Sequence, residues 1–301
     1  YVYYPQVFDG EEHEGYYTQE QIKDVVAYAA SKYINVVPEI EMPGHALAAL
    51  ASYPELSFDS TQTYKVSPTW GVFEQVFCPS ETTFKFFEGV MDEVVELFPS
   101  EYIHIGGDEC PKTAWKNSAF CQQLIRQLGL KDDVTPSKVD GVKHSKEDKL
   151  QSYFVTRMEK YLNDKGRNII GWDEILEGGL APNATVMSWR GVEGGLNAAK
   201  AGHNAIMTPM PYAYLDFYQE DPAIAPTTIG GYTTLKKTYS YNPAPDDADE
   251  LVKKHVIGMQ GNIWREYMKN SDRTDYQAFP RAMAIAETGW TLDANIMAGR
   301  D

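Results

Sequence analysis

Two adjacent carboxylates follow a pair of glycines in residues 102–109, which read YIHIGGDE. The apolar, β-forming residues at the start of this run predict a buried strand, and the two glycines permit a sharp exit from it. Because successive residues leaving a strand point in different directions, Asp108 and Glu109 can address different parts of a ligand. Such a pair suits acid and base catalysis with divided roles.

Two other interpretations fit the same stretch. An Asp-Glu pair after two glycines also occurs in solvated turns and at helix N-termini, where negative charge is favourable. A cation site is the third interpretation, but hard cations collect several oxygen ligands, and no Asp-x-Asp ladder lies nearby. We therefore expect no metal and no cofactor. Whether Asp108 and Glu109 are catalytic depends on the residues that the rest of the chain supplies.

One histidine and three cysteines lie around this pair. His104 precedes the glycines inside the predicted strand, so a core histidine is favoured over a direct catalyst. Cys78, Cys110 and Cys121 cannot all pair, and a chain of 301 residues needs no disulfide to fold, although a Cys110–Cys121 bridge is one option. Cys110 follows Glu109 directly, but no histidine lies nearby in the sequence to activate it, so a structural thiol is favoured over a nucleophile.

The composition is that of a soluble globular chain, with 43% hydrophobic and 23% charged residues. The net charge of −16 argues against nucleic acid and anionic membranes as partners, because both favour patches of Lys and Arg. No run of about 18 apolar residues predicts a membrane span, and residues 1–5 (YVYYP) lack the features of a signal peptide. The 20 tyrosines and 6 tryptophans supply aromatic surface for a core and for stacking on sugars.

Helices and strands alternate along the predicted chain. Helices are expected over residues 18–32, where Thr18 and Gln21 form a capping box, and over residues 81–98, 113–128, 147–165, 192–201 and 276–290. Besides the strand that begins at Tyr102, strands are expected over residues 34–40, 168–174, 184–190, 204–208 and 256–261. Residues 131–146 are charged and low in apolar side chains, which predicts a surface loop.

This alternation predicts parallel strands joined by right-handed crossovers. An open doubly wound sheet and a closed (β/α) barrel both fit, but no Gly-x-Gly-x-x-Gly follows an early strand, as a nucleotide-binding fold requires. Functional-looking side chains leave the ends of six strands, as expected where loops at one barrel face build a single site. We therefore expect an α/β fold, a TIM-type (β/α)8 barrel forming one catalytic domain over residues 1–301.

The side chains at the predicted strand ends are mostly acids and aromatic rings. Tryptophan faces pack on the C–H faces of a pyranose, and carboxylates accept hydrogen bonds from hydroxyls. One tryptophan alone is more often part of a core, but three at strand ends together favour a carbohydrate hydrolase. The set comprises Glu39, Glu41, His45, Asp108, Glu109, Trp172, Asp173, Glu174, Trp189, Arg190, Tyr214, Asp216, Trp264 and Glu266.

These residues lie in runs that resemble the strand-end motifs of glycoside hydrolase family 20, the β-N-acetylhexosaminidases. The resemblance covers nearly the whole chain, in the family's order: residues 38–45 (PEIEMPGH), 104–109 (HIGGDE), 171–175 (GWDEI), 188–191 (SWRG), 214–216 (YLD) and 261–266 (GNIWRE). It implies an exo-acting glycosidase that releases terminal β-linked N-acetylglucosamine or N-acetylgalactosamine. It also implies a substrate-assisted retaining mechanism, in which the 2-acetamido carbonyl attacks the anomeric carbon and forms an oxazolinium ion.

The resemblance also implies a role for each matching residue. Glu109 would protonate the leaving oxygen and later deprotonate water, and His45 would sit behind it and tune its proton affinity. Asp108 would orient the acetamido N–H, and Tyr214 would hydrogen-bond the acetamido oxygen. The remaining residues would bind the sugar, with Trp172, Trp189 and Trp264 around the acetamido methyl and the ring, and Asp216 and Glu266 on the outer hydroxyls.

The chain departs from the family pattern at its start. The family's first two barrel strands carry an arginine for the sugar and an acidic partner for the histidine that His45 matches, and neither strand is readable before Tyr17. About six of eight barrel units are therefore recognisable, and because exposed strand edges are normally covered, we expect a homodimer or another cover over the edges. A catalytically weak sugar-binding barrel is the alternative function, and a metal-dependent hydrolase is the third. The resemblance is compatible with a periplasmic or extracellular location, which the sequence itself leaves open.

Overall fold

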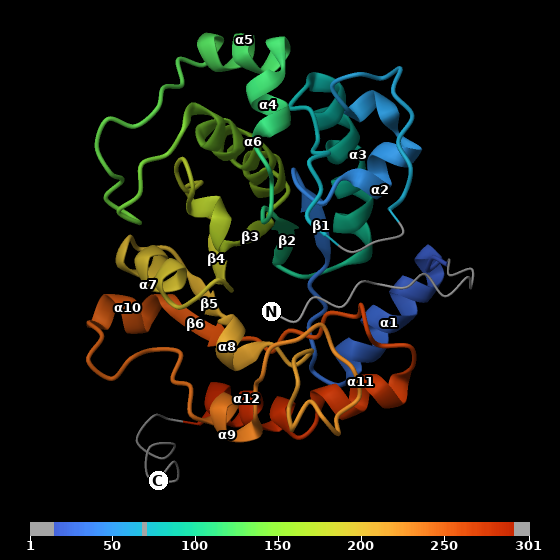
Figure 1. Cartoon of the computed structure of the whole chain (residues 1–301), viewed down its shortest axis with the longest axis vertical. Coiled ribbons are helices and arrows are strands. Elements are labelled where there is room, and N and C mark those ends of the chain that lie inside the picture. Colours follow the sequence, from blue (N-terminus) through green and yellow to red (C-terminus); the bar gives the residue numbers. More distant parts are fainter. Residues whose placement is uncertain (1–14, 68–70, 292–301) are drawn as a thin grey trace. The chain divides into compact units, whose positions relative to one another are not determined.

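A computed structural model of the chain describes residues 15–67 and 71–291 (Figure 1). These residues belong to two compact units that meet in the sequence between Thr185 and Val186. Within the described ranges, none of the helices combines the length and the apolar character needed to cross a membrane. Residues 1–14, where no barrel strand was readable in the sequence, lie outside the described part, and the single domain over residues 1–301 stays a prediction.

The first unit alternates helices with three parallel strands, which are hydrogen-bonded in the order β1-β2-β3. The register places Glu39 of β1 beside His104 of β2, and Tyr102 of β2 beside Asn168 of β3. The elements are α1 (Gln19–Ser31), β1 (Glu39–Met42), α2 (Leu47–Ser52), η1 (Pro54–Leu56), α3 (Glu81–Leu97), β2 (Tyr102–Gly106), α4 (Thr113–Asn117), α5 (Ala119–Gln127), α6 (Lys146–Asn163), β3 (Asn168–Trp172) and η2 (Asp173–Leu176).

Helices α3 and α6 supply much of the aromatic core of this unit. The apolar positions of α3 recur at helical spacing and are buried as predicted, from Phe84 to Leu97. Phe154 of α6 packs against Phe84 with ring centroids 4.7 Å apart. Ile103 and Ile105 of β2 are fully buried. Burial of such side chains contributes about 1.5–3 kcal/mol each, so the strand that leads into Asp108 and Glu109 is firmly anchored.

The first predicted strand is displaced by several residues. It was expected over residues 34–40, but β1 begins at Glu39, and Ile34 and Val37 before it are 59% and 39% exposed. Among the described residues of its unit, β1 pairs with β2 alone, and this pairing begins at Glu39, after Ile34 and Val37. Glu39 and Glu41 therefore lie inside a strand and not beyond its end.

Two predicted helices are each divided. The helix over residues 113–128 is split into α4 and α5 at Ser118, whose hydroxyl accepts a hydrogen bond from the Cys121 N–H and caps the second helix. The helix over residues 276–290 is interrupted at Pro280, which cannot donate a helical hydrogen bond. The capping box of Thr18 and Gln21 is confirmed. Residues 131–145 carry no helix or strand, as predicted, although His144 is buried.

The second unit has the same alternation, with parallel strands in the order β4-β5-β6. Helix α7 packs on β5 and β6, and α12 packs on β6. Parallel strands alternating with helices confirm the predicted α/β class in both units. The elements are β4 (Thr185–Ser188), α7 (Glu193–Lys200), β5 (Ala205–Met207), α8 (Met210–Ala213), α9 (Leu235–Tyr239), α10 (Glu250–His255), β6 (Val256–Met259), α11 (Ser271–Ala278) and α12 (Arg281–Trp290).

Candidate active site

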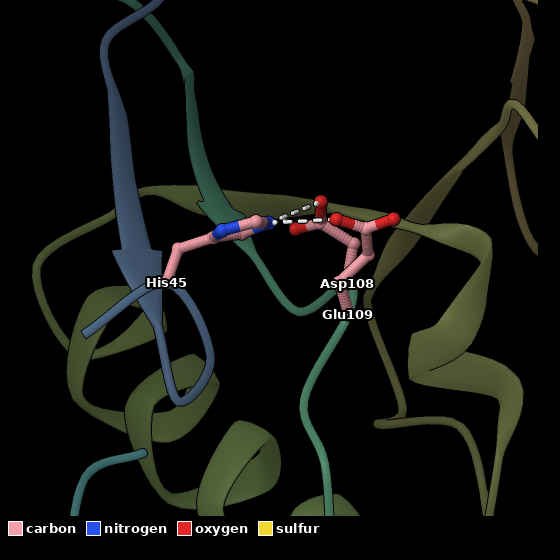
Figure 2. Close-up of side chains that lie close together, drawn as sticks. All are labelled: His45, Asp108 and Glu109. Atoms are coloured by element: carbon pink, nitrogen blue, oxygen red, sulfur yellow. Dashed lines mark hydrogen bonds and ion pairs between the residues drawn. The ribbon is translucent and has the colours of Figure 1, made fainter. Parts of the chain in front are cut away.

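The last residue of β2 and the segment that follows it, residues 106–112, are called the acid loop below. Its backbone is left-handed at three positions, with φ of +68° at Gly106, +94° at Gly107 and +44° at Glu109. Glycine adopts such angles readily, whereas a side chain as large as that of Glu109 rarely does. This backbone presents Asp108 and Glu109 side by side, with both carboxylates directed toward His45 (Figure 2).

The turn after β1 brings His45 to these carboxylates. A Cβ at Gly44 would lie 2.7 Å from the carbonyl oxygen of Asp108, so only glycine allows the turn to approach the acid loop this closely. As a result, His45 Nε2 lies 3.3 Å from Asp108 Oδ2 and 3.3 Å from Glu109 Oε2 (Figure 2). The structure thus joins three of the predicted site residues into one cluster.

The two carboxyl groups of this cluster favour the protonated form of His45. Hydrogen bonds to Asp108 and then to Glu109 raise the pKa of His45 to about 10. The ligand atoms of the three residues lie within 4.8 Å of one another, so by spacing alone they could hold a cation. An imidazolium has no lone pair for a metal, however, so a cation would first have to displace the proton from His45.

A second group of polar side chains, Glu39, His104 and Trp172, contacts the acid loop at Gly106. Trp172 Nε1 donates a hydrogen bond of 2.9 Å to Glu39 Oε1, and His104 Nδ1 lies 3.2 Å from the same oxygen. The Gly106 N–H donates to His104 Nδ1 over 3.0 Å. His104 is only 4% exposed, and burial lowers its pKa, so it is a neutral, buried ring, as expected for a core histidine.

Glu41 is a protonated carboxylic acid at neutral pH. Burial is the main cause that raises its pKa to about 10, followed by the charges of Asp108 and Glu39. Its carboxyl group lies so close to Gly106 that a Cβ at that position would overlap it. Glu41 therefore brings a neutral acid against the start of the acid loop, where a second carboxylate would be repelled by Asp108.

The predicted strand over residues 168–174 is shorter than expected. Trp172 is its last residue, and Asp173 and Glu174 open the 3₁₀ helix η2. All three side chains are buried, and the Trp172 ring lies 4.8 Å from the His104 ring. Trp172 therefore belongs to the layer beneath the acid loop, and its contact with a sugar remains a prediction.

The second unit holds the other predicted residues. The rings of Trp189 and Tyr214 lie 6.3 Å apart, and Tyr214 forms a parallel bridge with Asn262. Trp264 is 38% exposed, whereas Asp216 is only 4% exposed. A hollow in this unit is lined by side chains that include three of the predicted residues, Asp216, Trp264 and Glu266, together with Ile229, Met268 and Arg273. Arg190 is exposed.

The buried cation Arg281 holds the backbone around Asp216. Burial and the charge of Glu266 raise the pKa of Asp216 to about 8. Arg281, which is fully buried, donates hydrogen bonds to the carbonyl oxygens of Leu215 over 2.5 Å and of Phe217 over 3.2 Å. The guanidinium thus fixes the backbone on both sides of Asp216. Residues 214–217 are called the Asp216 segment below.

The disulfide option is wrong, because all three cysteines are free and buried. The thiols of Cys78 and Cys121 hydrogen-bond to each other, so the thiol partner of Cys121 is Cys78 and not the Cys110 that the sequence allowed. Burial raises the pKa of Cys110 to about 12, so its thiol stays protonated at neutral pH. This agrees with the prediction of a structural thiol.

Three residues at these sites were not predicted: Lys112 and Gln151 at the acid loop, and Arg281 at the Asp216 segment. All three act on backbone carbonyls, and a pattern of side-chain types carries no signal for such contacts. Only Lys112, which follows Glu109 by three residues, lies close enough in the sequence to have been considered.

Relatives of known type match the chain over nearly its whole length. The model of the glycosyl hydrolase family 20 catalytic domain matches residues 3–293. Beta-hexosaminidase of Porphyromonas gingivalis is 50% identical over 285 residues, which covers 94% of this chain and 35% of that protein. Beta-hexosaminidase of Vibrio furnissii is 36% identical over 295 residues, which covers 96% of this chain and 45% of that protein. The chain thus spans between about a third and a half of the length of these relatives.

Solved structures agree with these matches. The crystal structure of a beta-N-acetylhexosaminidase superposes with a TM-score of 0.82 at 31% identity, covering 97% of this chain and 61% of that chain. The GH20 exo beta-N-acetylglucosaminidase from Vibrio harveyi, in complex with N-acetylglucosamine, gives a TM-score of 0.77 at 33% identity, covering 93% of this chain and 42% of that chain. These matches confirm the predicted fold class, an α/β barrel of the TIM type.

Proposed function

Because the chain belongs to glycosyl hydrolase family 20, we propose that it carries the catalytic centre of an exo-acting glycosidase that releases terminal β-linked N-acetylhexosamine. The observation that carries the proposal is the cluster of Asp108 and Glu109, each 3.3 Å from one imidazolium nitrogen of His45. The Vibrio harveyi relative is described in complex with N-acetylglucosamine, which supports the substrate class.

The two carboxylates take separate parts in the proposed reaction. The acetamido oxygen of the sugar forms a bond to the anomeric carbon while the bond to the leaving oxygen breaks, and Glu109 gives that oxygen its proton. Asp108 accepts a hydrogen bond from the acetamido N–H and stabilises the positive charge of the oxazolinium ion. Water then attacks the anomeric carbon, the bond from that carbon to the acetamido oxygen breaks, and water passes a proton to Glu109, which restores the acid. Intramolecular attack removes the entropic cost of bringing in a separate nucleophile.

His45 makes this division of labour compatible with two adjacent acids. Its positive charge lies between Asp108 Oδ2 and Glu109 Oε2 and reduces the repulsion between the two carboxylates. Asp108 then remains charged while Glu109 exchanges its proton with the leaving oxygen and with water. His45 acts in this way through the two acids and not on the sugar.

The remaining predicted residues bind the sugar in this proposal. Asp216 Oδ1 is buried and has no hydrogen-bond partner in the described part of the chain, and Asp216 lines the hollow next to Trp264 and Glu266. A sugar hydroxyl would satisfy this oxygen, which is otherwise costly to bury. The proposal assigns Tyr214 to the acetamido oxygen, Glu266 to outer hydroxyls, and Trp172, Trp189 and Trp264 to the acetamido methyl and the ring.

A chromogenic assay separates this proposal from its alternatives. The chain and its Glu109→Gln variant are incubated with 4-nitrophenyl N-acetyl-β-D-glucosaminide and the corresponding galactosaminide, with and without a chelator. Turnover that the substitution abolishes and the chelator leaves intact supports the glycosidase. Binding of N-acetylglucosamine without turnover would identify a sugar-binding module, and loss of turnover with chelator would identify a metal-dependent hydrolase.

The expectation of a homodimer is kept as part of the proposal. Helix α1 buries none of its residues, and its Val25 and Tyr28 are 52% and 66% exposed. Strand β1, the next element after α1, has β2 as its one strand partner among the residues of this unit that the structure describes. A second copy would cover this apolar edge. Light scattering that gives a monomer mass at micromolar concentration would contradict it. The net charge of −16 supports the expectation that nucleic acid and anionic membranes are not partners.

A further inference from the structure

Two side chains from different elements hold the backbone of the acid loop. Gln151 Nε2 donates a hydrogen bond of 2.6 Å to the carbonyl oxygen of Gly107, immediately before Asp108. Lys112 Nζ donates a hydrogen bond of 2.7 Å to the carbonyl oxygen of Cys110, immediately after Glu109. The carbonyls on both sides of the acid pair are therefore fixed by side chains that play no part in the proposed chemistry.

The two side chains also bind each other. Lys112 Nζ donates a second hydrogen bond, of 2.6 Å, to Gln151 Oε1. Gln151 is 1% exposed and the Lys112 side chain is 13% exposed, so both contacts are sheltered from water. The charge of Lys112 is partnered by Asp148 Oδ1 at 3.9 Å, and the Asp148 side chain in turn caps α6 by accepting from the Ser145 N–H. The network thus connects the acid loop to the first turns of α6.

The acid loop requires such support because its backbone is strained. Glu109 holds a left-handed conformation, which costs a residue with a side chain about 1–3 kcal/mol unless the surroundings impose it. From one side the turn at Gly44 packs against the backbone of residues 108–110. The hydrogen bonds from Lys112 and Gln151 add a polar restraint at each end of the acid pair. Without them, the strain at Glu109 would be relieved by a movement of both carboxylates away from His45.

We propose that Lys112 and Gln151 are positioning residues, which hold Asp108 and Glu109 in the geometry that the reaction needs. The inference rests on the proposed function for its kinetic consequence, whereas the restraint on the loop itself is independent of it. Neither residue touches the sugar in this account. Both act through the backbone of the acid loop, so their loss should alter the rate of the chemical step more than the affinity for substrate.

The test uses three variants and one matched control. Gln151→Met removes both hydrogen bonds of that side chain at similar volume, and Gln151→Glu keeps an acceptor for Lys112 but loses the donor to Gly107. Lys112→Met removes the bond to Cys110. Gln122→Met is the control, because Gln122 Nε2 also donates to a backbone carbonyl, that of Trp115 in α4, and to Glu147 Oε1 in α6, and neither acceptor belongs to residues 106–112.

The kinetic measurement compares aryl N-acetyl-β-glucosaminides with good and poor leaving groups. We expect kcat to fall about 100-fold in the three variants, while KM changes by less than about threefold, since a misplacement near 1 Å has an effect of this size. The loss should be greater with the poor leaving group, because that substrate depends more on protonation by Glu109. Equal losses with both substrates, or an equal loss in the Gln122→Met control, would overturn the positioning role.

A second measurement does not depend on activity. Amide hydrogen exchange of residues 106–112 should become at least about tenfold faster in Gln151→Met and Lys112→Met than in the wild type and the control, with the rest of β2 unchanged. Unchanged exchange in this segment would overturn the inference, whether or not the chain is active. If the wild type hydrolyses no N-acetylhexosaminide, the proposed function fails, and the exchange measurement still decides whether Lys112 and Gln151 hold the loop.

Discussion

The acid loop and the Asp216 segment are held by similar backbone contacts, but the surroundings of their carboxyl groups differ. In each, a cationic side chain holds backbone carbonyls next to a carboxylate: Lys112, together with Gln151, in the first unit, and the buried Arg281 in the second. The carboxylates themselves differ. Asp108 and Glu109 share an imidazolium at 3.3 Å, whereas Asp216 is buried and its pKa is raised to about 8.

This difference indicates a division of work. In the proposed reaction, one of the two carboxyl groups beside the imidazolium supplies an anion and the other exchanges a proton. A buried carboxyl group with a raised pKa is better suited to hydrogen bonds with neutral hydroxyls. The acid loop is therefore equipped for chemistry and the Asp216 segment for binding, although both are shaped by cations that hold the main chain. Substitutions at Asp108, Glu109, Arg281, Asp216 and Glu41 test this difference.

The largest effect is expected at the acid loop. Asp108→Asn and Glu109→Gln should each lower kcat/KM on 4-nitrophenyl N-acetyl-β-D-glucosaminide by about 10³-fold or more, because one removes the stabilising anion and the other the acid. Steady-state kinetics with both variants at matched concentration checks this. A near-normal rate in either variant would refute the role given to that residue.

The next largest effect is expected on stability at Arg281. Arg281→Met should lower the free energy of unfolding by about 3 kcal/mol or more, because it leaves several buried carbonyl oxygens, including those of Leu215 and Phe217, without their donor. Urea unfolding followed by tryptophan fluorescence measures the change. The less buried Lys112→Met should lose less stability while losing more activity relative to it, and the reverse order would remove the contrast between the two loops.

A binding effect is expected at Asp216. Asp216→Asn should lower kcat/KM by about 10- to 100-fold, mainly through KM, because the hydroxyl contacts it makes are present in the bound substrate as well as in the transition state. Inhibition by free N-acetylglucosamine should weaken by a similar factor. A loss confined to kcat would place Asp216 in the chemical step and contradict the division of work.

The last expected effect is on the pH dependence of stability, at Glu41. Its pKa is about 10 in the fold and near 4.5 in the unfolded chain, so its favourable contribution is complete below about pH 4.5 and is lost as the pH rises toward 10. Glu41→Gln lacks this dependence. Relative to the wild type, the variant should therefore gain unfolding free energy between pH 5 and pH 9, by about 1.4 kcal/mol for each pH unit over which only the unfolded chain ionises, as measured by urea unfolding. A constant difference would show that Glu41 is ionised in the fold.

Local signals predicted the acid loop well and its supports poorly. The strand over residues 102–106 and the helix over residues 81–97 were predictable, because β-forming residues, glycines and helical periodicity are all local features. The position of β1 was not, because the apolar run before Glu39 does not reveal how many neighbours a strand has. Pro280 was visible in the sequence, and its missing N–H explains why the closing helix is divided.

The contacts that shape both loops are determined by tertiary packing. Lys112 and Gln151 are 39 positions apart in the chain and meet because α6 lies beside the segment that follows β2. Arg281 reaches the carbonyl oxygen of Leu215 across 66 positions. The acids and the tryptophans could be predicted from the sequence, since their side-chain types are typical of sugar-binding sites. A residue that binds only main-chain carbonyls has no typical side-chain type, so the sequence does not identify it.

In the proposed reaction the acetamido group of the substrate is the nucleophile, and a comparison of two substrates tests this step. The values of kcat/KM are measured for 4-nitrophenyl N-acetyl-β-D-glucosaminide and for 4-nitrophenyl β-D-glucoside, which has a hydroxyl in place of the acetamido group. We expect kcat/KM to be at least about 10³-fold lower for the glucoside, because the intramolecular attack is lost. Comparable rates on the two substrates would contradict it.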